Sequence, residues 1–275
     1  RVSYALDATY PYLTFTASAA PTMTINTYDS YVLDESMQYS VNGGEWVQLT
    51  AKTAITFGGD KGTLRLRGKS ANGTAASSSS RAQISFGDDN VQVACSGDIR
   101  TLVDYENYAT VSTANARFCN LFLSCGSLTS APDLPATTLA DHCYRNMFRL
   151  CTSLTVAPEL PATTLAESCY ECMFYDCTKL TTAPELPATT LAKFCYRYMF
   201  WNCPNLTMAP ELPATTLARY CYANMFYGCT SLTAAPELPA TTLVDHCYYE
   251  MFENCTNLRN IIVLAPDISA GDCLT

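Results

Sequence analysis

The feature that most constrains this chain is a repeat of 26 residues that fills its C-terminal part. A Met-Phe or Leu-Phe pair recurs six times at this interval, with a cysteine three residues later and a leucine three residues after that. The phenylalanines of these pairs are Phe122, Phe148, Phe174, Phe200, Phe226 and Phe252. One copy cannot bury its own Leu, Cys, Met and Phe, but stacked copies share a continuous core. The repeat therefore predicts a solenoid of six units.

Each unit is predicted to contain a helix. In the unit LPATTLAxxCYxxMFxxCxxLTxAPE, apolar residues recur every four positions, as in Leu165, Cys169 and Met173, which would place them on one helical stripe. A threonine before the stripe and an acidic residue three positions later, such as Thr164 and Glu167, are typical of a capping box. Residues that tolerate a left-handed conformation stand where such a helix would end: Asp176, Asn202, Gly228 and Asn254.

A short strand is predicted to follow each helix. Residues 153–157 alternate in polarity like a strand, and Pro158 then removes a donor from the hydrogen-bond ladder. Consecutive strands in register would form a parallel sheet at ~4.8 Å spacing, with the helices on the opposite face. The predicted fold is thus an α/β solenoid of the leucine-rich-repeat type, built from 26-residue units of a helix and a short parallel strand.

The N-terminal part follows a different pattern. Apolar and polar residues alternate with a period of two in about seven short segments, and Asn42-Gly43 between two of them is a strong hairpin signal. We therefore predict an antiparallel, Ig-like β-sandwich over residues 1–95. Residues 96–116 are predicted to form a linker and N-terminal cap, and residues 117–275 the solenoid.

The cysteine columns are predicted to be reduced. Within one unit, Cys143 and Cys151 would lie ~12 Å apart on a helix, and equivalent cysteines on adjacent helices ~8–10 Å apart. A disulfide requires Cα atoms within ~7 Å, so the columns indicate small buried apolar residues. Cys95 and Cys119 lie outside the columns, and the sequence leaves open whether they pair.

Composition excludes several functional classes. The chain is 48% hydrophobic and 15% charged, unlike a disordered polyampholyte. Its net charge of −9 argues against binding nucleic acid or anionic lipid, and no run approaches the ~20 apolar residues of a membrane-spanning helix. There are 2 histidines and no GxSxG, HExxH or P-loop pattern. We expect no enzymatic activity, no cofactor and no metal.

The repeat, with Met-Phe-x-x-Cys-x-x-Leu followed by an apolar-Pro segment, resembles the BspA-like leucine-rich-repeat surface proteins of anaerobic bacteria. The segments 12–17 and 38–46 resemble the β-domain that precedes such repeats. The resemblance implies export to the cell surface, an outer-membrane association or secretion, and a role in adhesion or protein interaction. The opening residues Arg1 to Tyr4 fit removal of a secretory signal and equally a trimmed cytosolic chain. The last unit stops at Thr275 before its own Met-Phe, so the repeats are expected to continue.

Two columns of varying or charged residues are candidate binding surfaces. The first contains charged and aromatic residues on the expected outer face of the helices, where aromatic residues favour contact with a protein or glycan. Its members are Arg145, Glu171, Arg197, Tyr249, Tyr175, Trp201 and Tyr227. The second is a column of carboxylates that would attract a cation or a basic partner: Asp133, Glu159, Glu185, Glu211 and Glu237. The plainer interpretation of both is a solvated surface.

These observations favour a non-enzymatic interaction or adhesion protein that binds a protein or glycan through the solenoid. Two alternatives remain open at this point. One is a carbohydrate-binding accessory that uses the β-sandwich, which an exposed Trp46 would support. The other is a structural spacer that displays another domain. The sequence does not determine the oligomeric state.

The cysteine interpretation predicts the outcome of a thiol titration. Denatured, unreduced protein should show most of its 15 thiols reactive with Ellman's reagent. Reduced and denatured protein is the control that gives the full count. Six or seven disulfides would contradict the ladder interpretation.

Overall fold

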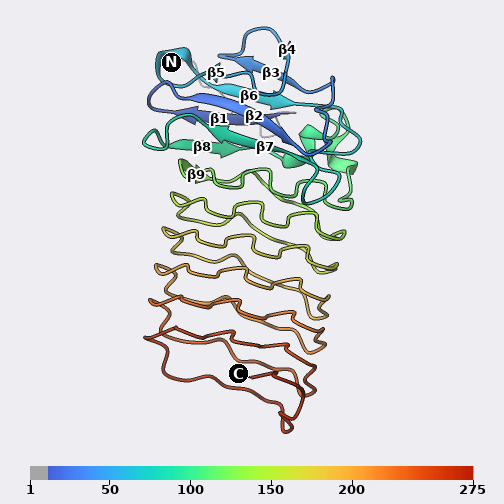
Figure 1. Cartoon of the computed structure of the whole chain (residues 1–275), viewed down its shortest axis with the longest axis vertical. Coiled ribbons are helices and arrows are strands. Elements are labelled where there is room, and N and C mark those ends of the chain that lie inside the picture. Colours follow the sequence, from blue (N-terminus) through green and yellow to red (C-terminus); the bar gives the residue numbers. More distant parts are fainter. Residues whose placement is uncertain (1–11, 275) are drawn as a thin grey trace, which may run out of the picture.

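The computed structural model describes residues 12–274, and it shows a β-sandwich continued by a stack of coils (Figure 1). The first sheet has the strand order β4-β3-β6-β1-β8-β9 and the second β5-β2-β7. The first sheet consists of β1 (Leu13–Ala17), β3 (Gln38–Val41), β4 (Val47–Gln48), β6 (Leu64–Arg67), β8 (Val93–Ser96) and β9 (Leu128–Ser130). The second consists of β2 (Thr22–Tyr28), β5 (Ile55–Thr56) and β7 (Arg81–Phe86). Three short 3-10 helices are η1 (Gly59–Lys61), η2 (Ile99–Leu102) and η3 (Tyr108–Thr110).

The alternation of apolar residues positions the two sheets face to face. In β1, Leu13 and Phe15 are fully buried, whereas the residues between and after them are partly or fully exposed. Phe15 meets Phe86 of the other sheet with ring centroids 5.8 Å apart. Asn42 and Gly43 have positive φ angles of 53° and 69°, as in a type I′ turn, and the N–H of Gly44 closes this turn on Val41 O at 3.0 Å. The predicted hairpin is therefore confirmed, between β3 and β4.

The expectation of a helix in every repeat is wrong. Among residues 12–274 there is no α-helix, and the segments predicted as helices are chains of turns. A leucine-rich-repeat-like α/β solenoid is therefore not the fold of this chain. Each 26-residue unit instead forms one coil, which we number from 1 to 6, with coil 1 spanning residues 115–140. The first ten residues of each coil are here called its turn strip: 115–124, 141–150, 167–176, 193–202, 219–228 and 245–254.

The backbone of a turn strip alternates between two kinds of hydrogen bond. In coil 2, the N–H groups of Tyr144, Asn146 and Phe148 donate to carbonyls of coil 3 at 2.9–3.0 Å. The N–H groups of the intervening residues Arg145 and Met147 donate to the carbonyl three residues earlier, at 3.1 Å. Both sets of donors are thus satisfied, half within the strip and half by the next coil.

This alternation requires a left-handed residue at every fourth position. In coils 2 to 6 these are His142, Asn146, Leu150, Ser168, Cys172, Asp176, Phe194, Tyr198, Asn202, Tyr220, Asn224, Gly228, His246, Glu250 and Asn254, with φ between 47° and 72°. Asn, Asp, His and Gly tolerate this conformation best and are frequent among them. The four residues expected to end a helix are left-handed, but as the last of three such positions in each strip.

Four-residue turns explain why the side chains seemed helical. Each turn buries its last two side chains, so in coil 2 the buried residues are Cys143, Tyr144, Met147 and Phe148. A spacing of four also brings residues together on an α-helix, whose period is 3.6. The amphipathic pattern therefore predicts the buried side chains correctly and the backbone conformation wrongly.

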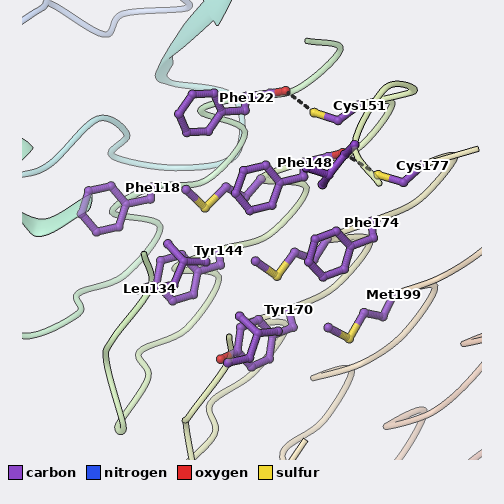
Figure 2. Packing of buried hydrophobic residues seen from close by; sticks show 14 of the residues in the cluster. Phe118, Phe122, Leu134, Tyr144, Phe148, Cys151, Tyr170, Phe174, Cys177 and Met199 are labelled. Atoms are coloured by element: carbon purple, nitrogen blue, oxygen red, sulfur yellow. Dashed lines mark hydrogen bonds between the residues drawn. The ribbon is translucent and has the colours of Figure 1, made fainter. Parts of the chain in front are cut away.

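Identical positions of successive coils stack into buried ladders. Phe122, Phe148 and Phe174 stand above one another with ring centroids 5.6–5.7 Å apart and interplanar angles of 8–14° (Figure 2). A second ladder continues from Phe118 through Tyr144 and the later tyrosines at 5.6–6.0 Å. The hydroxyl oxygens of Tyr144, Tyr170, Tyr196 and Tyr248 are buried without a hydrogen-bond partner among the described residues. The rings pack between coils as expected, but these hydroxyl groups reach neither bulk water nor the backbone.

The cysteines contribute a third ladder, and none is disulfide-bonded. All 15 are free and buried, including Cys95 and Cys119, which confirms the expectation of reduced columns. The thiol of Cys151 donates a hydrogen bond to the carbonyl oxygen of Phe122, one coil earlier, at 3.2 Å (Figure 2). The same bond recurs at 3.0–3.2 Å in the four later coils. This position is buried among apolar side chains but faces one carbonyl oxygen. A thiol fits it because it is apolar enough to be buried and can still donate a weak hydrogen bond, whereas serine would be too polar and alanine too small.

The sandwich takes the place of a preceding coil. β8 pairs in parallel with β9 of coil 1, and the Ile84 N–H of β7 donates to Leu121 O at 2.8 Å. The Cys125 thiol donates to Ile84 O at 3.0 Å, as later cysteines do to phenylalanine carbonyls. One hydrophobic cluster extends from Leu13 to Cys273. Both sheets thus cover the first coil, and the two parts share a core.

The stacked core makes a stability prediction. Phe200 is fully buried between Phe174 and Phe226, so Phe200→Ala should lower the free energy of unfolding by ~3–5 kcal/mol, measured by urea denaturation. Phe252→Ala is the matched control, because Phe252 ends the ladder and is partly exposed. Equal losses for the two variants, or a loss under ~1 kcal/mol for Phe200→Ala, would contradict this account.

Candidate functional site

The turn strips present their outward side chains in columns. In coils 2 to 6, the third, fourth, seventh and eighth residues of a strip point to the core, and the first, second, fifth, sixth, ninth and tenth lie on its outer side, where a few, such as Ser168, Cys172 and Asn224, are still buried. We call this outward surface of the six strips the turn face. Neighbouring members of a column belong to successive coils, so they lie next to each other and interact. The turn face contains all seven residues of the predicted partner-binding surface.

Three of the predicted contact residues are engaged with one another. Glu171 is 2% exposed and lies between Arg145, at 2.9 Å, and Arg197. Nε of Arg197 donates to Oε1 of Glu171 at 2.9 Å. The prediction that Glu171 is a free contact residue is therefore wrong, because two guanidinium groups from the adjacent coils enclose its carboxylate. Arg145 and Arg197 keep about a quarter of their side chains exposed.

Three other predicted residues form a stack on the surface. The ring of Trp201 lies 4.3 Å from Tyr175 and 5.4 Å from Tyr227, with interplanar angles of 7–8°. The guanidinium carbon of Arg149 covers the far face of Tyr175, 4.4 Å from the ring centre. All three rings are partly exposed. Because each ring faces its neighbours along the solenoid, its edge is the part that faces solvent.

A second surface stack was missed by sequence reasoning. Phe194 lies 5.3 Å from Tyr220, which lies 4.4 Å from His246, and the interplanar angles are 23–28°. These residues occupy the first left-handed position of coils 4 to 6. Reading the sequence with 26-residue spacing shows that this column contains aromatic residues and histidines. Only the position of one coil on the next shows that their rings stack.

Tyr249 lies apart from the other predicted contact residues. Ala223 separates it from Arg197 in the same column, and its ring contacts His246 at 5.7 Å. The neighbouring carboxylate of Glu250 raises the pKa of Tyr249 to about 12, so this phenol remains protonated. It is a hydrogen-bond donor at the edge of the turn face.

The predicted acidic column lies on another side of the coils. Asp133, Glu159, Glu185, Glu211 and Glu237 are all exposed, in the extended segments that follow the turn strips. Although Asp133 is exposed, neighbouring protein atoms displace part of the water around its carboxylate, and this desolvation, followed by the negative charges of Asp98 and Glu159, raises its pKa. An open hollow of about 430 Å³ lies between coils 2 and 3 beside this column, lined by Val156, Pro158, Glu159, Pro184 and Glu185 among others.

Trp46 of the sandwich is not an open aromatic platform. The guanidinium of Arg67 covers the ring of Trp46 at 4.0 Å, and Tyr12 packs against Trp46 at 5.6 Å. Arg67 also lies 4.2 Å from Tyr105. A sugar ring stacks on an uncovered aromatic face, whereas Trp46 has the Arg67 guanidinium over its ring and the Tyr12 ring packed against it at a tilt of 53°. This geometry disfavours the alternative in which the sandwich binds carbohydrate.

The thiols are poor nucleophiles. Burial raises the pKa of Cys172 to about 12, although it belongs to the sequence Cys169-x-x-Cys172, and burial also raises the pKa of Cys169. Thiolate is the reactive form, so these side chains are suited to packing. Within residues 12–274, no group of three or more His, Cys, Asp or Glu side chains is arranged to hold a metal ion.

Comparison with known proteins identifies no relative. No family model matches the chain, and neither a curated protein nor a solved structure does. In the described part of the chain, no helix has the length and apolar character needed to cross a bilayer. The turn face and the chemistry of its residues are therefore the features that indicate a function.

The raised pKa of Asp133 predicts a pH-dependent stability. The pKa of this carboxyl group is higher in the folded state than its usual value of 3.8, so the unfolded state ionises more easily. The carboxylate therefore lowers the free energy of unfolding as the pH rises from below 3.8 to above the folded-state pKa. Asp133→Asn removes this loss, so the variant should melt at a higher temperature than the parent at neutral pH. The gain should vanish in acid, where the parent carboxyl is protonated.

Glu211→Gln is the control for this prediction, because it removes one charge from an exposed position of the same column. Thermal melting followed by circular dichroism at several pH values measures both variants. A Tm gain for Asp133→Asn that persisted unchanged in acid would contradict the electrostatic cause.

Proposed function

We propose that this chain is a non-enzymatic interaction protein whose turn face binds a protein partner. The observation that carries the proposal is the pair of surface aromatic stacks on coils 3 to 6, each with an arginine against its first ring: Arg149 over Tyr175 and Arg197 over Phe194. Aromatic residues and arginine are enriched at protein interfaces and frequent among the residues that dominate binding energy.

The stacking favours a protein over a glycan as the partner. Each inner ring of the stacks has both faces against neighbouring rings, so the faces are unavailable to a sugar. The exposed edges carry tyrosine hydroxyl groups and the indole N–H of Trp201, which are hydrogen-bond donors for a polypeptide surface. The stack also holds these side chains in place, so little conformational entropy is lost on binding.

The chemistry of the remaining polar groups supports a non-enzymatic role. The thiols of the columns are buried, and burial raises their pKa values. Four of the five carboxylates of the acidic column, Glu159, Glu185, Glu211 and Glu237, occupy equivalent exposed positions, whereas acid–base catalysis uses groups with different environments. We place the activity at the cell surface, in adhesion, on the resemblance of the repeat to BspA-like surface proteins.

The proposal is tested by binding to an array of purified matrix proteins and glycans, read by biolayer interferometry. Trp201→Ala should weaken binding to the recognised protein by about 10–100-fold, as expected for a central aromatic contact. Met208→Ser is the matched control: it alters a 74% exposed apolar residue of the same coil, outside the turn strip.

An array that stays blank at high protein concentration would count heavily against the proposal. So would equal effects of the two substitutions, because the contact would then lie elsewhere on the coil. Circular dichroism of both variants shows that the coil remains folded.

A further inference from the structure

The turn face carries charge in blocks along the solenoid. The strips of coils 4 and 5 (193–202 and 219–228) contain three cationic residues, Lys193, Arg197 and Arg219, and no acidic residue. The strips on either side (167–176 and 245–254) contain three acidic residues each. The whole chain has a net charge of −9, so this two-coil band has the opposite sign to the molecule. We call the outward surface of coils 4 and 5 the cationic band.

The aromatic residues of the band add to its positive character. It includes Phe194, Tyr198, Trp201, Tyr220 and Tyr227. Aromatic rings are electron-rich on their faces and electropositive at their edges. In the two stacks the faces are covered by neighbouring rings, so the edges are directed outward. The outward groups are therefore cations, ring edges, phenol hydroxyls and one indole N–H.

The cations are held over the rings rather than neutralised by carboxylates in the band. Arg219 lies 5.1 Å from the centre of the Tyr220 ring, and Lys193 lies 4.7 Å from that of Phe194. Lys193 also approaches Glu167 of coil 3 at 4.0 Å, with both side chains nearly half exposed. Arg197 is paired with the buried Glu171. Lys193 and Arg219 are thus the positive charges most available to an incoming partner.

From this arrangement we infer that the cationic band recognises a short acidic polypeptide segment, with carboxylates on either side of an apolar residue. The inference rests on the proposed function, because it specifies the partner of the same turn face. The carboxylates meet Lys193, Arg219 and the phenol hydroxyls, and the apolar residue meets the edges of the surface stacks.

The flanking acidic strips limit the length of the anion. Coils 3 and 6 are three steps apart, or about 14 Å at the ~4.8 Å spacing of paired strands. A long polyanion such as nucleic acid or a sulfated glycan, placed along the solenoid, would meet the carboxylates of coils 3 and 6. Like charges repel it there, whereas a short segment lying across coils 4 and 5 avoids them. The covered ring faces also prevent the base stacking that single-stranded nucleic acid uses.

The inference is tested with a fluorescein-labelled peptide, Glu-Asp-Leu-Glu-Asp-Tyr, and its neutral counterpart, Gln-Asn-Leu-Gln-Asn-Tyr. Fluorescence anisotropy should show saturable binding of the acidic peptide to the full chain, about tenfold or more tighter than the neutral peptide. Added salt should weaken it, because the contact is between exposed charges. A labelled heparin oligosaccharide and a labelled oligo-dT strand are measured in parallel.

Lys193→Glu/Arg219→Glu should reduce binding of the acidic peptide by about tenfold or more. The matched control is Lys179→Glu, which reverses an exposed positive charge of coil 3 outside its turn strip. Equal affinity for the acidic and neutral peptides, or equal loss with the control, would overturn the inference. Tighter binding of heparin or oligo-dT than of the acidic peptide would also overturn it.

This test separates the inference from the proposed function. If the peptide fails to bind but a protein of the array binds in a Trp201-dependent way, the turn face is still the binding surface and only the acidic character of the partner is wrong. If the peptide binds as expected but Trp201→Ala leaves array binding unchanged, the assignment of the array partner to the turn face is wrong.

Discussion

The structure depends on how one coil satisfies the backbone of the next. In the turn strips of coils 1 to 5, alternate N–H groups donate to the following coil, and the others close turns within their own strip. This pattern forces every fourth residue into the left-handed region, at a cost that Asn, Asp, His and Gly reduce. A single coil leaves half of these donors unpaired, so the coils are stable when stacked. The carbonyls of the first coil have no preceding coil to donate to them, and the sandwich supplies donors instead: the N–H of Ile84 in β7 bonds Leu121 O and that of Val93 in β8 bonds Ser127 O.

The same stacking governs the chemistry of the surface. Side chains at equivalent positions lie next to each other, so each column becomes a row of interacting groups rather than a set of independent residues. Inside, this gives the phenylalanine, tyrosine and thiol ladders (Figure 2). Outside, it encloses Glu171 between two arginines and stacks Trp201 between two tyrosines. Candidate contact residues therefore have to be judged by what their neighbours in the adjacent coils leave exposed.

Sequence reasoning identified the buried positions well and the backbone poorly. Cys169, Met173 and Phe174 are buried as expected, and all cysteines are free. The helix was wrong because a strict spacing of four was treated as the helical period of 3.6. Two signals opposed the helix: the strips are rich in Cys, Tyr, Phe and Asn, which favour helices less than Ala, Leu or Glu do, and turn-forming residues recur at every fourth position. The burial of Glu171 could not be inferred without knowing that adjacent coils bring both arginines to it.

The sequence by itself determined that copies of one unit stack and which side chains fill the shared interior, because the interval and the apolar positions are written in it. The tertiary structure alone decided where the backbone hydrogen bonds go and which surface groups remain available. Side-chain spacing shows which residues share a side of the chain, but it does not specify whether an N–H group bonds within its own segment or to the next coil. That choice sets the distance between columns, and with it the pairing and stacking of the outward side chains.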